Sequence, residues 1–184
     1  MHEYEITESQ LIYEGYRYEL RKDGVVMSDG TVHQREYFQD QGAVAIVAVD
    51  DHERVMLIRQ YRHPARQRLW EIPAGLRDVA GESPDLTARR ELAEETDLRA
   101  ARWDYLGSFY NSPGISDEQV MYYLARDLST VPDAQRYERK EEEAEMELRF
   151  WELDKALAAL DSGEIVNGVC ALGLFLATRR LRLG

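Results

Sequence analysis

The sequence has only one cysteine, Cys170, so an intramolecular disulfide and a zinc site built on cysteine ligands are both excluded. It also lacks a long apolar segment. Its longest apolar run, residues 43–49, is far short of the ~20 residues that a membrane-spanning helix needs. The acidic N-terminus has no hydrophobic core of the kind that signal peptides carry. We therefore expect a cytoplasmic protein with no membrane contact.

Positive charge is scarce as well. There are 23 Lys and Arg against 35 Asp and Glu, which gives a net charge of −12 and a pI near 4.8. Nucleic-acid binding depends on a basic surplus that displaces counterions, so nucleic acid is excluded as the main partner. Neither a P-loop nor a G-x-G-x-x-G motif occurs, so a nucleotide would not be bound by either of these glycine-rich phosphate-binding loops. Because an acidic protein repels a diphosphate, a diphosphate site would need bound metal ions or local arginines.

The remaining composition, 44% hydrophobic and 32% charged residues, is that of an ordinary globular protein with a sizeable core. Near the N-terminus, aromatic and polar residues alternate over residues 12–13 and 16–20. Turn signals follow at Asp23-Gly24 and at residues 28–30, so we expect a small antiparallel unit. Its tyrosines suit either a surface sheet that covers the core or a dimer or ligand interface.

Residues 42–50 form a continuous apolar run, which is typical of a central strand. Other expected strands begin at residue 35 or span residues 54–60, 103–110, 119–125 and 146–153. Helices are expected at residues 84–96, 154–160 and 167–180, the last of them capped by Asn167. Residues 127–143 are polar without an apolar period and predict a mobile loop.

The first of these helices carries an unusual group of carboxylates. Ser83-Pro84 is typical of an N-cap followed by proline at the first helical position. Glu91, Glu94 and Glu95 then lie at i, i+3 and i+4, within an arc of about 100°. Each helical pair of like charges destabilises the helix by roughly 0.2–0.5 kcal/mol. A hard divalent cation bound between the carboxylates would make their interaction stabilising. In isolation, such a cluster is usually a solvated helix face, so its context decides.

The context resembles the signature of the Nudix hydrolases, G-x5-E-x7-R-E-U-x-E-E-x-G-U, where U is aliphatic. The matching residues are Gly75, Glu82, Arg90, Glu91, Leu92, Glu94, Glu95 and Leu98. The chain departs from the signature at two places. The first gap holds six residues in place of five, which a loop tolerates at little cost. Asp97 replaces the last glycine, and we expect it to adopt the left-handed conformation at a cost near ~1 kcal/mol.

Over residues 16–178 the chain resembles the ADP-ribose pyrophosphatase branch of this family. The matching strings are RE at residues 35–36, GAVAIVA at 42–48, QYRH at 60–63, LWEIPAG at 69–75, SPGISDE at 112–118, EEAEM at 142–146 and GEIVN at 163–167. A proline 15 residues beyond Leu98, here Pro113, is also typical of that branch. The short strings are weak one by one, but their order and spacing are specific.

Two further clusters bear on a diphosphate substrate. Four arginines, Arg59, Arg62, Arg66 and Arg68, lie within ten residues. They suit either a solvated loop or a phosphate contact, because the planar guanidinium matches phosphate geometry. The acidic run at residues 141–143 is, by itself, most often a solvated charge run.

The resemblance assigns a role to each of these residues. Glu91, Glu95 and Glu94 would hold Mg²⁺ or Mn²⁺ with the Ala74 carbonyl. Gly75, Glu82 and Arg90 would be structural. Glu143 would be the general base, with Glu142 the second choice. Arg62 would contact phosphate, while Tyr18, Arg35 and Glu36 would hold the adenosine end.

The resemblance also implies an α/β fold. We expect a Nudix-type α/β/α sandwich with a mixed sheet over residues 42–184, and residues 1–41 as an antiparallel strand extension used for dimerisation and substrate binding. The implied activity is hydrolysis of ADP-ribose to AMP and ribose 5-phosphate by a homodimer. The alternatives are a pyrophosphatase for another nucleoside diphosphate sugar, such as GDP-mannose, and a non-catalytic module that binds ADP-ribose.

Overall fold

The computed structural model describes residues 4–139 and 145–183, and the chain forms two compact units. The smaller unit consists of Met1–Gly42 and Tyr110–Gln119, and the larger unit of Ala43–Phe109 and Val120–Gly184. The sequence division at residue 42 assigns residues 110–119 to the main domain, whereas here they belong to the smaller unit. No helix in the described part of the chain is long and apolar enough to cross a bilayer.

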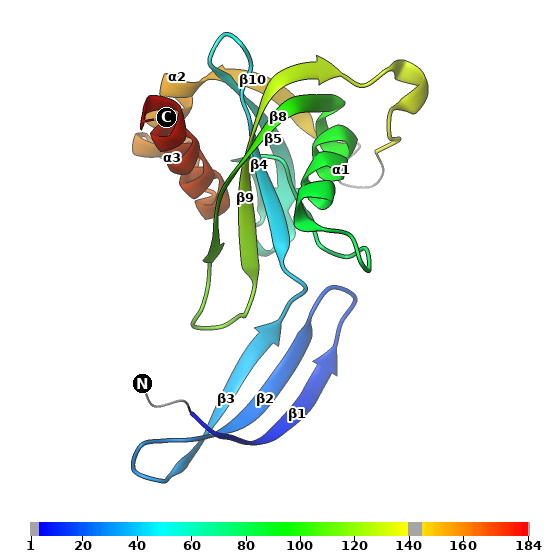
Figure 1. Cartoon of the computed structure of the whole chain (residues 1–184). Coiled ribbons are helices and arrows are strands. Elements are labelled where there is room, and N and C mark those ends of the chain that lie inside the picture. Colours follow the sequence, from blue (N-terminus) through cyan, green and yellow to red (C-terminus); the bar gives the residue numbers. More distant parts are fainter. Residues whose placement is uncertain (1–3, 140–144, 184) are drawn as a thin grey trace. The chain divides into compact units, whose positions relative to one another are not determined.

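The smaller unit contains the expected antiparallel sheet, in the order β1 (Ile6–Glu14), β2 (Glu19–Val26) and β3 (Val32–Gln39) (Figure 1). The turn expected at Asp23-Gly24 is wrong, because both residues pair within β2. A Cβ at Gly24 would lie 2.9 Å from Thr7 Oγ1, so this glycine serves close packing inside the sheet. The chain turns instead at Gly15, whose N–H donates to the Tyr18 carbonyl over 3.0 Å.

The larger unit contains two sheets. The first, in the order β7 (Ala74–Leu76), β4 (Ala43–Ala48), β9 (Gln119–Thr130) and β8 (Leu98–Tyr110), is mixed, because β4 is parallel to β9 and antiparallel to β7. The second is antiparallel, in the order β10 (Glu147–Glu152), β5 (Arg54–Arg62) and β6 (Gln67–Glu71).

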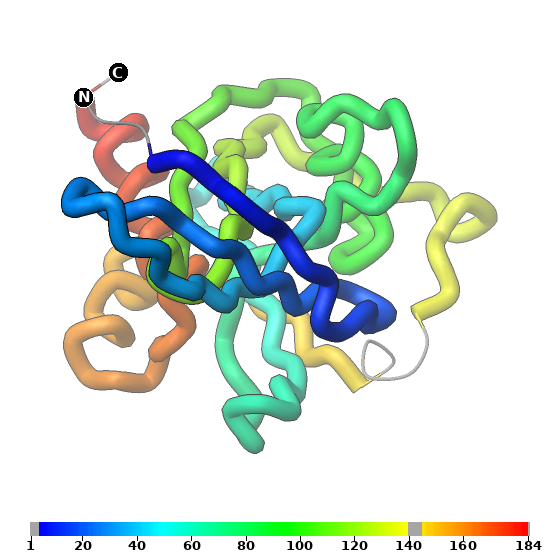
Figure 2. The backbone as a smooth tube through the Cα atoms, turned by 90° about the horizontal axis from the view of Figure 1, so that it is seen from below, coloured from blue at the N-terminus to red at the C-terminus, as the bar shows by residue number. Residues whose placement is uncertain are grey.

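Helices cover both sides of these sheets. Helix α1 (Pro84–Thr96) lies on one side, and α2 (Leu153–Asp161) and α3 (Gly168–Leu183) lie on the other (Figures 1 and 2). Strand β4 is buried throughout, and its side chains alternate between the two sides. Ala45 and Val47 belong to the core cluster shared with α2 and α3, whereas Val44 and Ile46 belong to the cluster shared with α1. This confirms the predicted α/β/α sandwich and its central strand.

The observed limits of the helices and strands confirm some of the sequence predictions and contradict others. The range predicted for α1 is the range observed. Asn167 caps α3 as expected, its Oδ1 accepting from the Cys170 N–H over 2.9 Å. The loop expected from residue 127 is wrong at its start, because β9 continues to Thr130 and a 3₁₀ turn, η2, follows at Asp133–Gln135. The side chains of residues 129–130 are exposed, so polar composition there did not exclude a strand.

Candidate active site

The two ends of α1 fix the position of its carboxylates. Pro84 occupies the first turn, but the Ser83 side chain does not cap a backbone amide and donates instead to Asp85 Oδ1 over 2.7 Å. At the other end, Asp97 is left-handed with φ 56° and ψ 27°, as predicted. Its N–H donates to the Ala93 carbonyl over 3.1 Å and so closes the last turn of the helix.

Glu95 lies against β7. The residue is only 6% exposed, and its Oε2 accepts from the Ala74 N–H over 2.9 Å. The carbonyl of Ala74 was predicted to be a metal ligand, whereas the contact seen here uses its amide. The amide contact joins α1 to β7 at the point where the predicted ligands meet.

Glu91 also faces β7, one helical turn before Glu95. Its carboxylate lies directly over Gly75, where a Cβ would come within 1.9 Å of Glu91 Cδ. Gly75 is therefore required for space and not for a left-handed backbone. Burial raises the pKa of Glu91 to about 7, against the opposing effect of the Arg90 charge. A buried carboxylate of this kind needs a positive partner.

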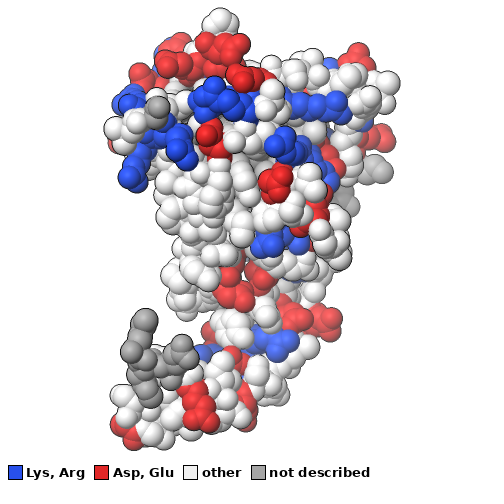
Figure 3. Space-filling model, viewed as in Figure 1, with Lys and Arg blue, Asp and Glu red and all other residues white. Residues whose placement is uncertain are grey.

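Arg90 is that partner in the structure. It contacts four carboxylates: Nη1 lies 2.6 Å from Glu91 Oε1 and 3.2 Å from Glu94 Oε2, while Nη2 lies 3.1 Å from Glu82 Oε2 and 3.5 Å from Asp78 Oδ1. Burial lowers the pKa of Arg90, but the carboxylates of Glu82, Glu91 and Glu94 outweigh that effect and raise it. The repulsion expected among the glutamates of α1 is thus offset within the chain. Elsewhere too, acidic and basic side chains lie next to one another on the face of the larger unit that Figure 3 draws.

The donor set suits a hard divalent cation, because the buried Glu95 and the partly buried Glu91 bring two carboxylates to the same short strand. Among residues 4–139 and 145–183, however, no three His, Cys, Asp or Glu side chains are gathered as they stand around an ion position. Arg90 takes oxygens of Glu91 and Glu94 that a metal would use. The metal-binding roles therefore stay predictions, supported by the chemistry of the donors.

Arg62, predicted to contact phosphate, binds a buried carboxylate. Its Nε and Nη2 hold Glu71, at 2.9 Å from Oε1 and 2.6 Å from Oε2. Glu71 is 3% exposed and also accepts from Asn167 Nδ2 over 3.1 Å and from Gln60 Nε2 over 3.3 Å. These contacts with Glu71 raise the pKa of Arg62 against its burial, and Glu95 adds to the effect.

Sequence reasoning missed this network, although a signal was present. Glu71 is an acidic residue between Trp70 and Ile72, which are both buried. A carboxylate in such a position requires a charged or hydrogen-bonded partner.

The other three arginines of the sequence cluster have different surroundings. The Arg59 guanidinium lies 5.6 Å from the centre of the Trp70 ring, and Arg68 forms an ion pair with Glu145. Arg66 is left-handed at the end of η1 (His63–Ala65). The sequence cluster is therefore spread over several separate contacts.

The predicted adenosine-binding residues lie in the smaller unit. The Tyr18 ring meets Phe38 edge to face, with centroids 4.9 Å apart. Tyr18 also lines an open cavity of about 480 Å³ formed by residues 14–19, 21 and 39–41. Arg35 and Glu36 are exposed on β3, where Arg35 Nη1 donates to the Gln34 carbonyl over 3.0 Å. Their roles stay predictions, and Glu142 and Glu143 lie outside the described residues.

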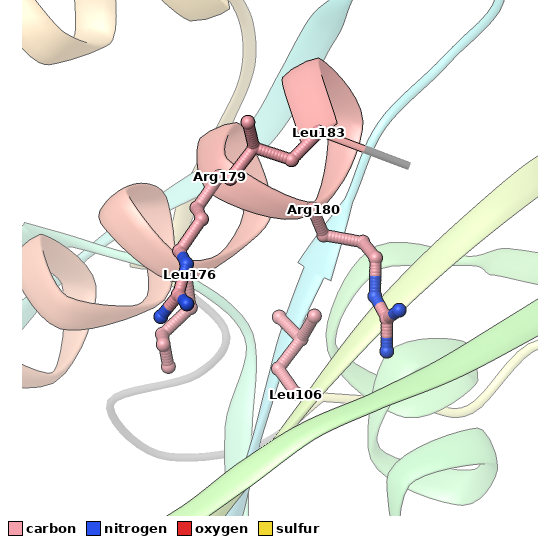
Figure 4. Close-up of a pocket in the computed structure, with 5 residues that line it drawn as sticks. All are labelled: Leu106, Leu176, Arg179, Arg180 and Leu183. Carbon is pink, nitrogen blue, oxygen red and sulfur yellow. The ribbon is translucent and has the colours of Figure 1, made fainter.

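A second cavity, of about 300 Å³, lies between β8 and the end of α3 (Figure 4). Its lining consists of leucine and arginine side chains: Leu106, Leu176, Arg179, Arg180 and Leu183. None of the described residues that line it carries a carboxylate, so they do not provide the ligands that the predicted metal chemistry needs.

Comparisons with known proteins show what this chain is similar to. A family model described as the NUDIX domain matches residues 39–167. An ADP-ribose pyrophosphatase from Mycobacterium tuberculosis is 43% identical over 94% of this chain and 82% of its own length. One from Bacillus subtilis is 34% identical over 89% and 86%. A GDP-mannose pyrophosphatase from Escherichia coli is 30% identical over 88% and 84%.

The fold has a close counterpart among solved structures. A crystal structure described as an ADP compounds hydrolase superposes with a TM-score of 0.84, covering 99% of this chain and 96% of its own, at 21% sequence identity. At that identity the likeness supports the fold alone.

Proposed function

Because this chain belongs to the Nudix family, we propose that it hydrolyses the diphosphate of ADP-ribose to AMP and ribose 5-phosphate. The observation that carries this proposal is the 43% identity, over nearly the whole chain, to an ADP-ribose pyrophosphatase. The retention of every charged signature residue on or before α1 supports it further. The activity requires that water attack one phosphorus while the bridging P–O bond breaks.

The metal site of the proposal is the β7 side of α1. Glu91 and Glu95 would be the main ligands, with Glu94 and the Ala74 carbonyl, and Mg²⁺ or Mn²⁺ would be the ion. When bound, a divalent ion balances the charge of the diphosphate oxygens and makes a nearby water more acidic. The burial of Glu95 and the low exposure of the Glu91 side chain, 13%, support this assignment. Glu82 and Arg90 would brace the loop against the helix, as their 3.1 Å contact suggests.

The proton of the attacking water would go to Glu143, with Glu142 as the second choice. A carboxylate that holds no metal is suited to orient and deprotonate the water. Glu143→Gln should cut turnover while leaving Mn²⁺ affinity, measured by calorimetry, nearly intact. A Glu142→Gln enzyme that is inactive beside an active Glu143→Gln enzyme would move the base by one residue.

Further residues are proposed to recognise the two ends of the substrate. Arg62 would contact phosphate, and its contact with Glu71 would then orient the guanidinium. Tyr18, Arg35 and Glu36 would hold the adenosine end, for which an aromatic ring and a charged pair are suitable.

A homodimer in the cytoplasm is part of the proposal. Every residue of β1 is exposed, including the apolar side chains of Ile6, Leu11 and Ile12. Such a surface suits contact with a second copy of the chain, through N-terminal strands that are exchanged or packed together. Light scattering at micromolar concentration should report a dimer, and a monomer would refute this part.

The substrate assignment is tested with purified enzyme and phosphatase, measuring phosphate released from ADP-ribose and from GDP-mannose with Mg²⁺ or Mn²⁺. We expect higher kcat/KM for ADP-ribose and no release in EDTA. Preference for GDP-mannose would favour the alternative that relatives at about 30% identity represent. Tight binding of ADP-ribose without turnover would identify a non-catalytic module.

A further inference from the structure

Asn167 lies directly before α3, and its side chain makes two contacts at once. Oδ1 accepts from the Cys170 N–H over 2.9 Å and so caps the helix. Nδ2 donates to Glu71 Oε1 over 3.1 Å. Serine, threonine or aspartate could make the first contact, whereas the second needs a donor that reaches β6. The amide of Asn167 therefore joins the start of α3 to the carboxylate at the end of β6.

Glu71 passes this contact on to Arg62. Its buried carboxylate accepts from the side chains of Asn167 and Gln60 as well as from Arg62. Arg62 uses Nε and Nη2 for this pair, which leaves Nη1 of the guanidinium for another acceptor. Because further donors hold the Glu71 carboxylate in place, the planar guanidinium that binds it is fixed in orientation.

Described contacts also place this network next to a proposed metal ligand. Two residues separate Glu71 from Ala74, whose N–H donates to Glu95 Oε2 over 2.9 Å. The hydrogen bonds with Glu71 raise the pKa of Arg62 against its burial, and the charge of Glu95 acts in the same direction. The Arg62 side chain is still 38% exposed. Its guanidinium therefore lies between a buried anchor and solvent, within electrostatic reach of Glu95.

We propose that Asn167 is a positioning residue for binding of the diphosphate. By holding Glu71, it fixes the Arg62 guanidinium in one orientation before substrate arrives. The inference rests on the proposed function, in which Arg62 contacts phosphate. Pre-organisation strengthens binding because less freedom is lost when the ligand arrives. Since the contact exists both before and during the reaction, its loss should raise KM and leave kcat nearly unchanged.

A purely structural role makes different predictions. If Asn167 only capped α3, its replacement would fray the helix, and any effect on substrate would not depend on Arg62. Cys170 reports on fraying directly, because Asn167 caps its N–H and its side chain is buried. Opening of the first turn would expose the thiol to a disulfide reagent.

The test compares Asn167→Ser, Asn167→Asp, Arg62→Ala and the double variant Asn167→Ser/Arg62→Ala with the wild type. Serine still caps a helix but is too short to reach Glu71, while aspartate caps it and replaces the amide donor by a second carboxylate. Val166→Ala is the matched control, since that neighbouring side chain is 58% exposed. Measured for each are kcat and KM with ADP-ribose, the Kd of its non-hydrolysable methylene analogue with Mn²⁺, and the labelling rate of Cys170.

We expect Asn167→Ser to raise KM and Kd by about 10-fold, with kcat close to wild type and Cys170 still protected. Asn167→Asp should weaken binding at least as much, because its carboxylate repels that of Glu71. The double variant should bind no more weakly than Arg62→Ala, because Asn167 acts through Arg62. Val166→Ala should match the wild type.

Several results would overturn the proposal. In an active enzyme, Asn167→Ser with wild-type KM and Kd would refute the positioning role alone. Weaker binding that is accompanied by rapid labelling of Cys170, or that also occurs in Val166→Ala, would assign Asn167 a structural role. Losses that add in the double variant would show that Asn167 does not act through Arg62. A wild-type enzyme that hydrolyses no nucleoside diphosphate sugar would refute the proposed function itself, and the positioning role with it.

Discussion

At the scale of single residues, Gly75 shows how one missing side chain places a carboxylate. The Glu91 carboxylate occupies the space that any β-carbon at residue 75 would fill. The sequence pointed to this glycine through the signature, but a spacing pattern does not say what a residue touches. Only the packing of β7 against α1 gives Gly75 its physical reason.

Gly75→Ala should therefore displace Glu91 and reduce activity. We expect kcat/KM for ADP-ribose to fall by about 10- to 100-fold and Mn²⁺ affinity to weaken. Gly168→Ala is the control, because a Cβ at Gly168 meets no atom within 4 Å and that residue begins α3. If the two alanine variants bind Mn²⁺ equally well, the carboxylate of Glu91 is not a ligand.

Glu95→Gln tests the neighbouring carboxylate. The amide keeps an oxygen that can accept from the Ala74 N–H, so the fold should be retained, but the negative charge is lost. We expect kcat to fall by roughly 10²-fold or more together with weaker Mn²⁺ binding, since hard cations prefer carboxylate oxygens. Wild-type turnover would remove Glu95 from the set of ligands.

Cys170 should be inert in the folded protein. Burial raises the pKa of its thiol to about 12, and the charge of Glu71 acts in the same direction. Since the thiolate is the reactive form, a disulfide reagent at pH 8 should not label the enzyme until denaturant is added. Rapid labelling without denaturant would show that α3 opens at this position.

At the scale of elements, sequence signals worked where they were local. Proline at the start and a left-handed aspartate at the end set the limits of α1, and the apolar run set β4. Strands β6 and β7 were not predicted, because they are short and flank Pro73, so neither shows a repeating pattern. The Asp23-Gly24 dipeptide misled for the opposite reason, since a strong turn signal was overruled by pairing on both sides of β2.

The turn between β4 and β5 depends on Asp50. Its Oδ1 accepts from the N–H groups of His52 (3.0 Å) and Arg54 (2.9 Å), and Oδ2 binds the Arg54 side chain. Burial raises the pKa of Asp50, but these hydrogen bonds outweigh it, so the pKa lies below its ordinary value. Asp50→Asn should reduce the free energy of unfolding by about 1–3 kcal/mol at pH 7.

This loss should depend on pH in a definite direction. A carboxylate with a depressed folded-state pKa contributes fully above its unfolded pKa of about 3.9 and loses that contribution as the pH falls through the folded value. The difference between wild type and Asp50→Asn in urea unfolding should therefore shrink below about pH 4. Asp51→Asn, at the exposed next residue, is the control. A difference that does not change with pH would exclude the charge as its cause.

At the scale of the whole molecule, the arrangement of the site depends on contacts between elements more than the fold does. The sandwich could be anticipated from the resemblance and from the continuous apolar run at residues 42–50. The pairing of Arg62 with Glu71 could not, because the two residues lie on different strands, β5 and β6, and their contact follows no spacing rule. The resemblance assigned roles to residues. Only the folded structure shows which of these residues already contact other side chains.

Metal and nucleotide should stabilise the enzyme together. A ligand that binds only the folded state adds about 2.7 kcal/mol at a concentration 100 times its Kd. Mn²⁺ with a non-hydrolysable methylene analogue of ADP-ribose should therefore raise the melting temperature by several degrees, and EDTA should abolish the shift. The Glu95→Gln variant should show little shift. An equal shift in wild type and variant would place the binding site elsewhere.

The contacts of Arg90 with four carboxylates bear on how a divalent ion would bind at the proposed site. If Glu91 and Glu94 hold the ion as proposed, the ion would share these two carboxylates with Arg90, whose Nη1 contacts one oxygen of each. The positive charge of Arg90 would then oppose that of the ion and weaken its binding. The occupancy of such a site would follow the concentration of free divalent ions in the cell.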